Sequence, residues 1–330
     1  MLRRFCLGLL LGTLILAPHR ANAGPALVFE PYNGTVFYSE DPDLPWFPAS
    51  LTKLMTAYVT FQAIKDGKIA LDTKLACSKN AVAQAPTKLG LPVGGEITVD
   101  TALKVLIVKS ANDVAVMLAE GVGGDLDSFV GQMNAAAQKL GMTKTHFANA
   151  NGLPDERQVT TARDLAKLAR AIIVEFPEYS NLFSLPQVQV GKRVLRTHNG
   201  LLIDYPGADG MKTGFICNSG YNVVASATRD GRKLVAVVLG EVSIASRRDR
   251  ATDLLENGFK RYFWKSVFGT SLDGLAMQAS LTDQPTHLFD SICGPGRAAA
   301  RAAVAKPRTS SGVKKKYVKK KSSSSVATTR

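Results

Sequence analysis

Apolar residues recur at helical spacing over several stretches between residues 48 and 173. The clearest stretch follows Pro48 and is ended by Gly67, and its apolar positions are Leu51, Leu54, Met55, Tyr58 and Val59. The same spacing predicts helices over residues 98–108, 112–121, 129–140 and 161–173. The middle of the chain, from about residue 71 to 175, is therefore predicted to be a helical subdomain.

A period of two replaces the helical period in two other parts of the chain. Residues 26–38 predict two short strands joined by Asn33-Gly34, a dipeptide typical of hairpin turns. Alternation returns over residues 187–196, 221–228 and 233–239, with Asp230-Gly231 as a second hairpin turn, and a helical pattern follows over residues 252–264. Because helices and strands are segregated along the chain, we expect an α+β fold with a mainly antiparallel sheet flanked by helices.

The first 23 residues have the pattern of a secretory signal peptide. Arg3 and Arg4 precede the apolar run Phe5–Ala17, and Ala21-Asn22-Ala23 is a typical cleavage sequence before Gly24. The apolar run is too short to span a bilayer. We expect an exported protein of the periplasm or cell-wall space, with no transmembrane helix after cleavage.

Positive charge is concentrated at the two ends of the chain. The net charge is +14, of which residues 297–330 contribute +11 without any acidic residue, and residues 24–296 are neutral. A neutral body argues against a nucleic-acid-binding protein. We expect a catalytic domain over residues 24–265, a short extension over 266–296 and a basic, disordered tail over 297–330. The Lys314–Lys321 cluster would either contact an anionic membrane or wall polymer, or remain solvated without a fixed partner.

Three cysteines remain after removal of the signal peptide, at positions 77, 217 and 293. Export permits disulfides, and one cysteine stays unpaired within the chain. A bond between Cys217 and Cys293 would close a loop of about 75 residues and contribute about 4 kcal/mol in the chain-entropy model. The alternative is three separate buried thiols, and the sequence leaves both open.

Ser50 and Lys53 lie three residues apart at the start of the helix that follows Pro48. Positions i and i+3 share a helix face, so the lysine amine could take the proton of the serine hydroxyl. Lysine is a base only when neutral, and lowering its pKa from about 10.4 towards 7 requires about 4 to 5 kcal/mol of differential interaction. Burial, the helix N-terminus and a second cation would all favour the neutral amine. Taken alone, the pair could also be a helix-capping serine with a surface lysine.

Two further motifs favour the catalytic interpretation of Ser50. Ser110-Ala111-Asn112 lies where two apolar helical stretches meet, and Lys212-Thr213-Gly214 precedes Phe215 in the strand-rich half. S-x-x-K, an S-D-N-type motif and K-T-G, spaced here by about 60 and about 100 residues, form the signature of class A β-lactamases and penicillin-binding proteins. Ser78-Lys79-Asn80 also fits S-x-N, but it comes too soon after Ser50 and precedes a loop-like stretch, so Ser110 is preferred.

With these motifs the chain resembles the low-molecular-mass penicillin-binding proteins of the serine D-alanyl-D-alanine carboxypeptidase family. The resemblance covers about residues 26–263 and includes the stretches ALVFEPYNGTVFY, NANGLPDERQVTTARDLAKLA, RTHNGLL and GYNVVASATRDGRKLVAVVLG. It implies the fold shared by penicillin-binding proteins and β-lactamases. It also implies a reaction that needs neither a metal nor a cofactor.

The resemblance implies a catalytic role for each residue of the first two motifs. Ser50 would attack the carbonyl of the penultimate D-Ala and become acylated, with Lys53 as the general base. Ser110 would relay the proton to the departing amine. Asn112 would hold the substrate backbone and orient Lys53.

Substrate binding would fall to the third motif and to an arginine. The residues concerned are Lys212, Thr213, Gly214, Phe215 and Arg247. Lys212 and Thr213 would bind the terminal carboxylate, and the backbone N–H groups of Ser50 and Phe215 would form the oxyanion hole. Arg247 would assist with the carboxylate, although the adjacent Arg248 leaves that assignment ambiguous.

The implied substrates are peptidoglycan stem peptides, and β-lactams would be covalent inhibitors. A class A β-lactamase needs a glutamate for deacylation, usually within E-x-x-L-N, and the corresponding loop here is GLPDERQV. We therefore expect a carboxypeptidase on which β-lactams stay attached to Ser50. A D,D-endopeptidase acting on cross-links remains an alternative, because the cleft walls decide that preference. A catalytically silent wall-binding protein is a third alternative, which the intact motifs disfavour.

Overall fold

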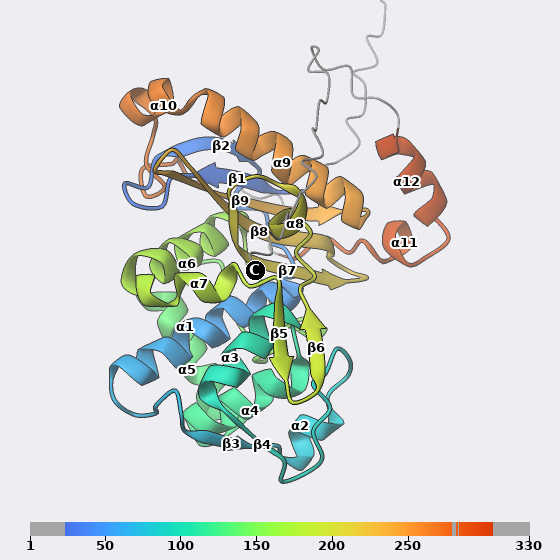
Figure 1. Cartoon of the computed structure of the whole chain (residues 1–330). Coiled ribbons are helices and arrows are strands. Elements are labelled where there is room, and N and C mark those ends of the chain that lie inside the picture. Colours follow the sequence, from blue (N-terminus) through green and yellow to red (C-terminus); the bar gives the residue numbers. More distant parts are fainter. Residues whose placement is uncertain (1–23, 279–281, 283, 306–330) are drawn as a thin grey trace, which may run out of the picture.

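The computed structural model describes residues 24–278, 282 and 284–305, with a five-stranded antiparallel sheet at the centre (Figure 1). The strands lie in the order β2, β1, β9, β8, β7, so that β7 is an edge strand. Their bounds are β1 Ala26–Phe29, β2 Val36–Glu40, β7 Ala208–Ile216, β8 Gly220–Arg229 and β9 Arg232–Glu241. The sheet thus brings the first strands of the domain beside the last one, β9.

Both predicted hairpins are present. Asp230 and Gly231 join β8 to β9, and their φ angles of 50° and 73° are positive, as a type I′ turn requires. Residues 30–35 join β1 to β2, with Gly34 at a φ of 77°. Residues 187–196 form a separate hairpin of β5 (Gln187–Val190) and β6 (Arg193–Arg196). The expected α+β fold with an antiparallel sheet is confirmed.

The two faces of the sheet are covered by different helices. Side chains alternate along β9, with Val235, Val237 and Leu239 in one core and Leu234, Ala236 and Val238 in the other. The first core contains residues of α6 (Ala162–Glu175), and the second contains residues of α9 (Ile244–Lys260). The sheet is therefore hydrophobic on both sides.

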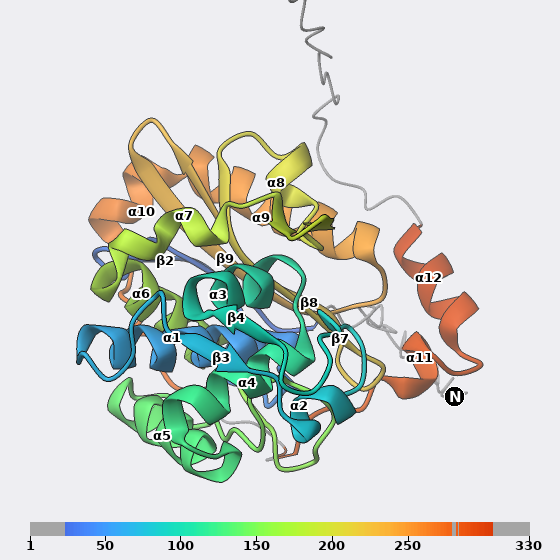
Figure 2. The ribbon, with the colours of Figure 1, turned by 60° about the horizontal axis from the view of Figure 1, so that its bottom comes forward.

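The helices of the middle of the chain pack around α1 (Thr52–Lys65), which is buried over most of its length. It contacts α3 (Val99–Val108), α4 (Asn112–Gly123), α5 (Leu126–Lys139) and α6. Figure 2 shows α1 to α5 grouped on one side of the sheet. The other elements of this block are η1 Ala49–Leu51, β3 Lys74–Ala76, α2 Lys79–Ala83, β4 Glu96–Thr98, α3 Val99–Val108, α4 Asn112–Gly123 and α5 Leu126–Lys139. Three short elements, η2 Pro177–Tyr179, α7 Ser180–Phe183 and α8 Leu201–Asp204, connect the helical block to the sheet.

Capping side chains mark where several of the helices begin. The Thr98 side chain accepts the N–H of Thr101 and caps α3, as expected. Asp125 caps α5 and starts it three residues before the predicted position. The helix predicted over residues 252–264 was wrong at its start, because Ser243 forms a capping box at the beginning of α9. A second helix, α10 (Tyr262–Phe268), follows directly.

Beyond α10, the described part of the chain contains two short helices, α11 (Phe289–Ile292) and α12 (Arg297–Ala305), which lie beyond the end of β7 (Figure 1). The Cys217–Cys293 disulfide is present, and Cys77 is a free buried thiol. The prediction of a disordered tail from residue 297 is wrong for residues 297–305, where an alanine-rich sequence of high helix propensity forms α12. Residues 306–330 and the predicted signal peptide, 1–23, lie outside the described residues.

In the part of the chain that the structure describes, no helix is both long enough and apolar enough to cross a membrane.

Candidate active site

Ser50 lies in the 3-10 turn η1, which leads directly into α1. The turn lies close against β7, since a Cβ on Gly214 would be 3.1 Å from the backbone nitrogen of Ser50. Asn222 of β8 holds the segment before the turn, because its Nδ2 donates to the carbonyl oxygen of Phe47 at 3.1 Å. Ser50 itself is only half-buried, so a substrate can reach it.

Lys53 lies in the first turn of α1 and is fully buried. Its Nζ is 3.0 Å from Ser50 Oγ and 2.7 Å from Asn112 Oδ1, and it also contacts the backbone oxygen of Asn151. The amide and carbonyl oxygens can only accept hydrogen bonds, whereas the Ser50 hydroxyl can also donate one. A neutral Lys53 would therefore donate to Asn112 and Asn151 and offer its lone pair to the Ser50 hydroxyl.

Burial and a second cation hold Lys53 towards that neutral form. Burial lowers the pKa of Lys53 well below its usual value, and the positive charge of Lys212 lowers it further. Asp113 raises the pKa of Lys53, but its carboxylate oxygens also accept the backbone N–H groups of Leu89 and Gly90 at 2.9 and 2.7 Å. The second cation that the chemistry of Lys53 requires is thus present.

Ser110 and Asn112 lie at the junction of α3 and α4 and are held by a neighbouring loop. Ser110 has a φ of 61°, which is uncommon for a residue with a side chain. Thr87 Oγ1 donates to the backbone oxygen of Ser110 at 3.0 Å, and the backbone oxygen of Thr87 accepts the N–H of Asn112 at 2.7 Å. Asn112 Nδ2 donates to the backbone oxygen of Ala85 at 2.9 Å, which leaves the amide oxygen directed at Lys53.

Lys212 connects the helical side of the site to the strand side. It is buried on β7, and its Nζ donates to Ser110 Oγ at 2.8 Å and to the backbone oxygen of Thr213 at 2.9 Å. An ammonium has three donors, so one remains for a ligand. Burial, with help from the charge of Arg247, lowers the pKa of Lys212 to about 7. A bound anion would favour its charged form.

Arg247, and not Arg248, is the arginine that lies with these residues. Arg247 of α9 is buried, and its guanidinium donates to the backbone oxygens of His198 and Asn222, both at 3.4 Å. Burial lowers the pKa of Arg247 to about 10. Its Nε finds no hydrogen-bond partner among the residues that the structure describes. Arg248 is exposed enough to pair with Asp204 at the surface.

Thr213, Gly214 and Phe215 follow Lys212 along β7. The outer edge of β7 pairs with none of the other described strands. A side chain at Gly214 would collide with the turn η1, because its Cβ would lie 3.0 Å from the carbonyl oxygen of Pro48. Glycine therefore allows the close approach that places the backbone of Phe215 near that of Ser50. The Phe215 ring is half exposed and packs against Tyr221, with ring centroids 4.4 Å apart.

The motifs did not point to two further residues, Asn151 and Gly152. The backbone oxygen of Asn151 is a partner of Lys53. Gly152 has a φ of 82°, and a Cβ there would lie 1.9 Å from the carbonyl oxygen of Ala49, so only glycine fits. The Asn-Gly pair is a turn signal, but nothing local in the sequence places that turn against Ser50.

Ser78, the other serine that fits S-x-N, caps α2. Its Oγ accepts the N–H of Ala81 at 3.0 Å and donates to Glu120 Oε1 at 3.0 Å. Both bonds are explained by capping and by packing of α2 against α4. Ser110 therefore remains the preferred second serine.

The assembled groups suit acyl transfer. A serine hydroxyl adjoins an amine held towards neutrality, a second hydroxyl adjoins a second lysine, and a buried guanidinium retains an unused donor. No cluster of three or more His, Cys, Asp or Glu that could bind a metal occurs within the described ranges. Fold and site together are typical of the penicillin-binding-protein and β-lactamase class.

The chain belongs to the D-alanyl-D-alanine carboxypeptidase family, whose model matches residues 14–243. It is 37% identical over 242 residues to D-alanyl-D-alanine carboxypeptidase DacC of Escherichia coli, covering 71% of this chain and 60% of that protein. It is 32% identical over 249 residues to D-alanyl-D-alanine carboxypeptidase of Streptomyces sp. strain K15, covering 68% and 83%. The family predicted from the motifs is confirmed.

Solved structures give the same result for the fold. Penicillin-binding protein 5 of Haemophilus influenzae matches with a TM-score of 0.70 and 34% identity, covering 74% of this chain and 73% of that chain. Penicillin-binding protein D2 of Listeria monocytogenes, in its cefotaxime-bound form, matches with a TM-score of 0.66 and 32% identity, covering 72% and 97%. The chain spans between 60% and 64% of the length of several curated relatives, including those of Escherichia coli, Haemophilus influenzae and Bacillus subtilis.

Proposed function

We propose that the protein is a serine D-alanyl-D-alanine carboxypeptidase that removes the terminal D-Ala from peptidoglycan stem peptides. The observation that carries this proposal is the environment of Lys53, which is buried, hydrogen-bonded to two pure acceptors and 3.0 Å from Ser50 Oγ. That environment suits a general base. The names of the relatives supply the substrate class.

In the acylation step, Ser50 Oγ attacks the carbonyl carbon of the penultimate D-Ala while Lys53 Nζ takes the hydroxyl proton. Negative charge develops on the carbonyl oxygen, and the backbone N–H groups of Ser50 and Phe215 stabilise it. The C–N bond then breaks, and the proton that Lys53 took from Ser50 passes through the Ser110 hydroxyl to the leaving amine, which leaves Lys53 neutral again. The products are free D-Ala and a peptidyl ester of Ser50.

Recognition of the free carboxylate falls to Lys212, Thr213 and Arg247. Lys212 has one unused donor as an ammonium, and Arg247 has an unused Nε–H, so both favour an anion between them. Binding the terminal carboxylate would raise the pKa of Lys212 from about 7 and keep it charged. This arrangement favours removal of a carboxyl-terminal residue.

In the second step, water attacks the ester carbonyl carbon and gives a proton to Lys53. The bond between that carbon and Ser50 Oγ then breaks, and Lys53 returns the proton to Ser50 Oγ, so that the shortened peptide leaves and the free serine is restored. A β-lactam would acylate Ser50 in the same way but would leave slowly. Glu156, the glutamate of the loop 152–159, has a side chain that is 73% exposed and lies 3.5 Å from His287. It is therefore poorly placed to activate a water at a buried ester. Structures of Listeria monocytogenes penicillin-binding protein D2 in cefotaxime-bound and ampicillin-bound forms support the same expectation.

We also propose that the protein acts outside the cytoplasm, on the basis of its N-terminal sequence and its disulfide. The lysines between Lys314 and Lys321 would add electrostatic attraction to an anionic membrane or wall polymer, at about 1 kcal/mol for each lysine near the surface. Neither the location of the protein nor the charge of these lysines alters the chemistry at Ser50.

The test is intact-mass spectrometry of the protein after treatment with penicillin, with D-Ala release from a pentapeptide measured in parallel. The proposal expects a single adduct on Ser50 and stoichiometric release of D-Ala, and the folded Ser50→Ala variant should show neither. An adduct without D-Ala release would refute the carboxypeptidase proposal and favour endopeptidase or transpeptidase action. Absence of any adduct would mean that the site is not a penicillin-reactive serine site.

A further inference from the structure

Residues 284–296, which we call the strap, lie outside the family match, which ends at residue 243. The strap includes α11 and lies beyond the end of β7, close to the strand that carries Lys212 to Phe215 (Figures 1 and 2). It is attached to elements on both sides of the active site.

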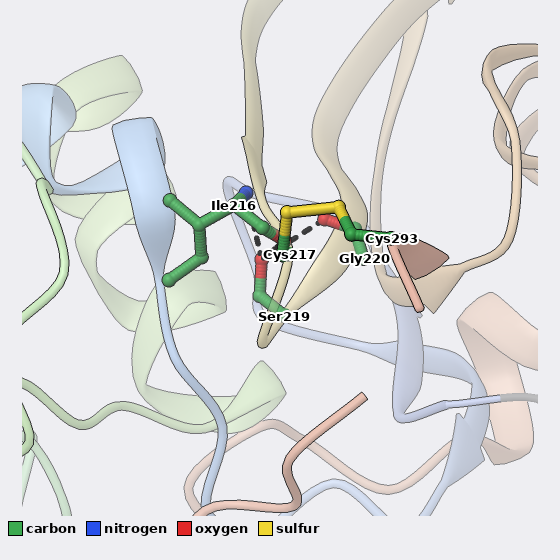
Figure 3. The surroundings of a disulfide bond; sticks show 5 residues. All are labelled: Ile216, Cys217, Ser219, Gly220 and Cys293. Carbon is green, nitrogen blue, oxygen red and sulfur yellow. Dashed lines mark hydrogen bonds between the residues drawn. A yellow bond between two sulfur atoms is a disulfide. The ribbon is translucent and has the colours of Figure 1, made fainter. Parts of the chain in front are cut away.

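On the strand side, the strap is bound to the turn that joins β7 to β8. Figure 3 shows the disulfide between Cys217 of this turn and Cys293 of the strap, whose Cα atoms are 5.6 Å apart. The N–H of Leu288 donates to the backbone oxygen of Asn218 at 2.9 Å. Ile292 is buried and packs near Gly220, where an added Cβ would lie 3.3 Å from its Cδ1. Leu288 and Cys293 of the strap therefore bind to the same turn, and Ile292 packs against the start of β8.

On the nucleophile side, His287 touches two segments that position Ser50. Its ring meets Phe47 edge-on, with centroids 5.1 Å apart, and Phe47 is three residues before Ser50. Its Nε2 is 3.5 Å from Glu156 Oε2, in the loop that begins with Gly152. The strap thus connects the turn between β7 and β8, on the strand side of the site, with the segments of Phe47 and Glu156 on the nucleophile side.

The order of groups along β7 determines how a peptide would lie there. Lys212 and Thr213, proposed to bind the terminal carboxylate, precede Phe215, proposed to bind the reacting carbonyl oxygen through its N–H. A peptide along the free edge of β7 would therefore run antiparallel to it, with the residues before the scissile bond extending towards Cys217. At about 3.3 Å per residue, two residues of extended peptide span about 7 Å, which corresponds to the two residues from Phe215, near the end of β7, to Cys217 in the turn that follows.

We propose that the strap is a binding subsite for the part of the stem peptide that precedes D-Ala-D-Ala, held in place by the Cys217–Cys293 disulfide. This inference rests on the proposed function and specifies its substrate as an extended peptide. His287 and Phe289, which is 56% exposed, are the side chains that the strap offers for contact. Because binding energy from remote residues is used at the reacting centre, long peptides should benefit and short ones should not.

The test compares two substrates, a stem pentapeptide and N-acetyl-D-Ala-D-Ala, on a variant that carries both Cys217→Ser and Cys293→Ser. We expect kcat/KM for the pentapeptide to fall about tenfold, while kcat/KM for the short substrate changes less than about twofold. Cys77→Ser, which replaces the free buried thiol, is the matched control and should change neither. His287→Ala, a change at a half-exposed side chain that leaves the disulfide intact, should reproduce part of the selective loss.

Equal losses on both substrates would overturn the inference and leave the disulfide with a purely stabilising role. Unchanged kinetics on both would overturn it as well. A third readout is independent of D-Ala release: the rate of Ser50 acylation by a penicillin with a bulky acyl side chain, compared with 6-aminopenicillanic acid, which lacks one. If the wild-type protein released no D-Ala, the proposed function would fail. A selective loss of labelling by the bulky penicillin in the cysteine variant would still support the subsite, and equal labelling would refute it.

Discussion

The two lysines of the site are both buried, yet their surroundings favour different charge states, neutral for Lys53 and positive for Lys212. Lys53, on the helical side, has three partners, of which only the Ser50 hydroxyl can donate a hydrogen bond. Lys212, on the strand side, has two partners and keeps one donor free. The partners of Lys53 suit a neutral amine. The partners of Lys212 suit an ammonium with one donor left to bind an anion.

This difference shows how one protein can hold a base and a cation side by side. The charge of Lys212 lowers the pKa of Lys53, and the charge of Arg247 lowers the pKa of Lys212. A substrate carboxylate bound at Lys212 and Arg247 would compensate their charges and keep Lys212 protonated. Ser110, which Lys212 contacts directly, lies between the two sides.

Among the changes compared here, the largest effect is expected at Ser110, because its hydroxyl contacts Lys212 and is the proposed route of the proton to the leaving amine. Ser110→Ala should lower kcat/KM for D-Ala release about 100- to 1000-fold, since it removes a positioned proton-transfer group. The measurement is steady-state kinetics on a pentapeptide. Ser78→Ala is the matched control. The kcat/KM of this variant should stay within about twofold of the wild-type value. Its free energy of unfolding should fall by about 1 kcal/mol, because Ser78 caps α2. Comparable losses of activity in both variants would contradict the assignment.

The strand side is tested by the two adjacent arginines. Arg247→Gln should lower kcat/KM about 10- to 100-fold, mainly through KM, because it removes a charged partner of the carboxylate. Arg248→Gln, at the exposed neighbour that pairs with Asp204, should change kcat/KM less than about twofold. Steady-state kinetics on the pentapeptide distinguish the two variants, and thermal melting verifies that both are folded. A larger effect of Arg248→Gln would show that the wrong arginine has been assigned.

The last prediction concerns pH, where the change near neutrality is gradual. Lys53 must lose its proton to act, so kcat/KM should rise with pH on the acid side. Lys212 must keep its proton to bind the carboxylate, so kcat/KM should fall above its pKa of about 7, by about tenfold per pH unit. In kcat, which reports the substrate complex, the descending limb should lie at higher pH, because the bound carboxylate raises the pKa of Lys212. If the pH profiles of kcat and kcat/KM descended at the same pH, the proposal that a charged Lys212 binds the carboxylate would be refuted.

Much of the fold and most of the site could be predicted from the sequence, because the signals are local. Both hairpin turns were visible as Asn-Gly and Asp-Gly between alternating strands. The helix over residues 98–108 was visible from its capping threonine and its apolar period. Ser50 and Lys53 share a face through their spacing alone, and the other two motifs followed from a known pattern.

Other features depended on contacts between residues distant in the chain, so only the tertiary structure decided them. The pair Arg247 and Arg248 is symmetric in sequence, and burial against Asn222 and His198 alone distinguishes its members. Asn151 contacts Lys53, 98 positions away in the sequence, and Gly152 lies against Ala49 because its loop packs on the turn η1. The choice between a disulfide and separate thiols was open in the sequence, because it depends on the spatial distance of two Cα atoms that are 76 residues apart. Local sequence patterns therefore identified the reacting groups, and only the tertiary structure showed their surroundings. The reason is that the charge state of a side chain, and its accessibility to a substrate, depend on all the residues that pack around it.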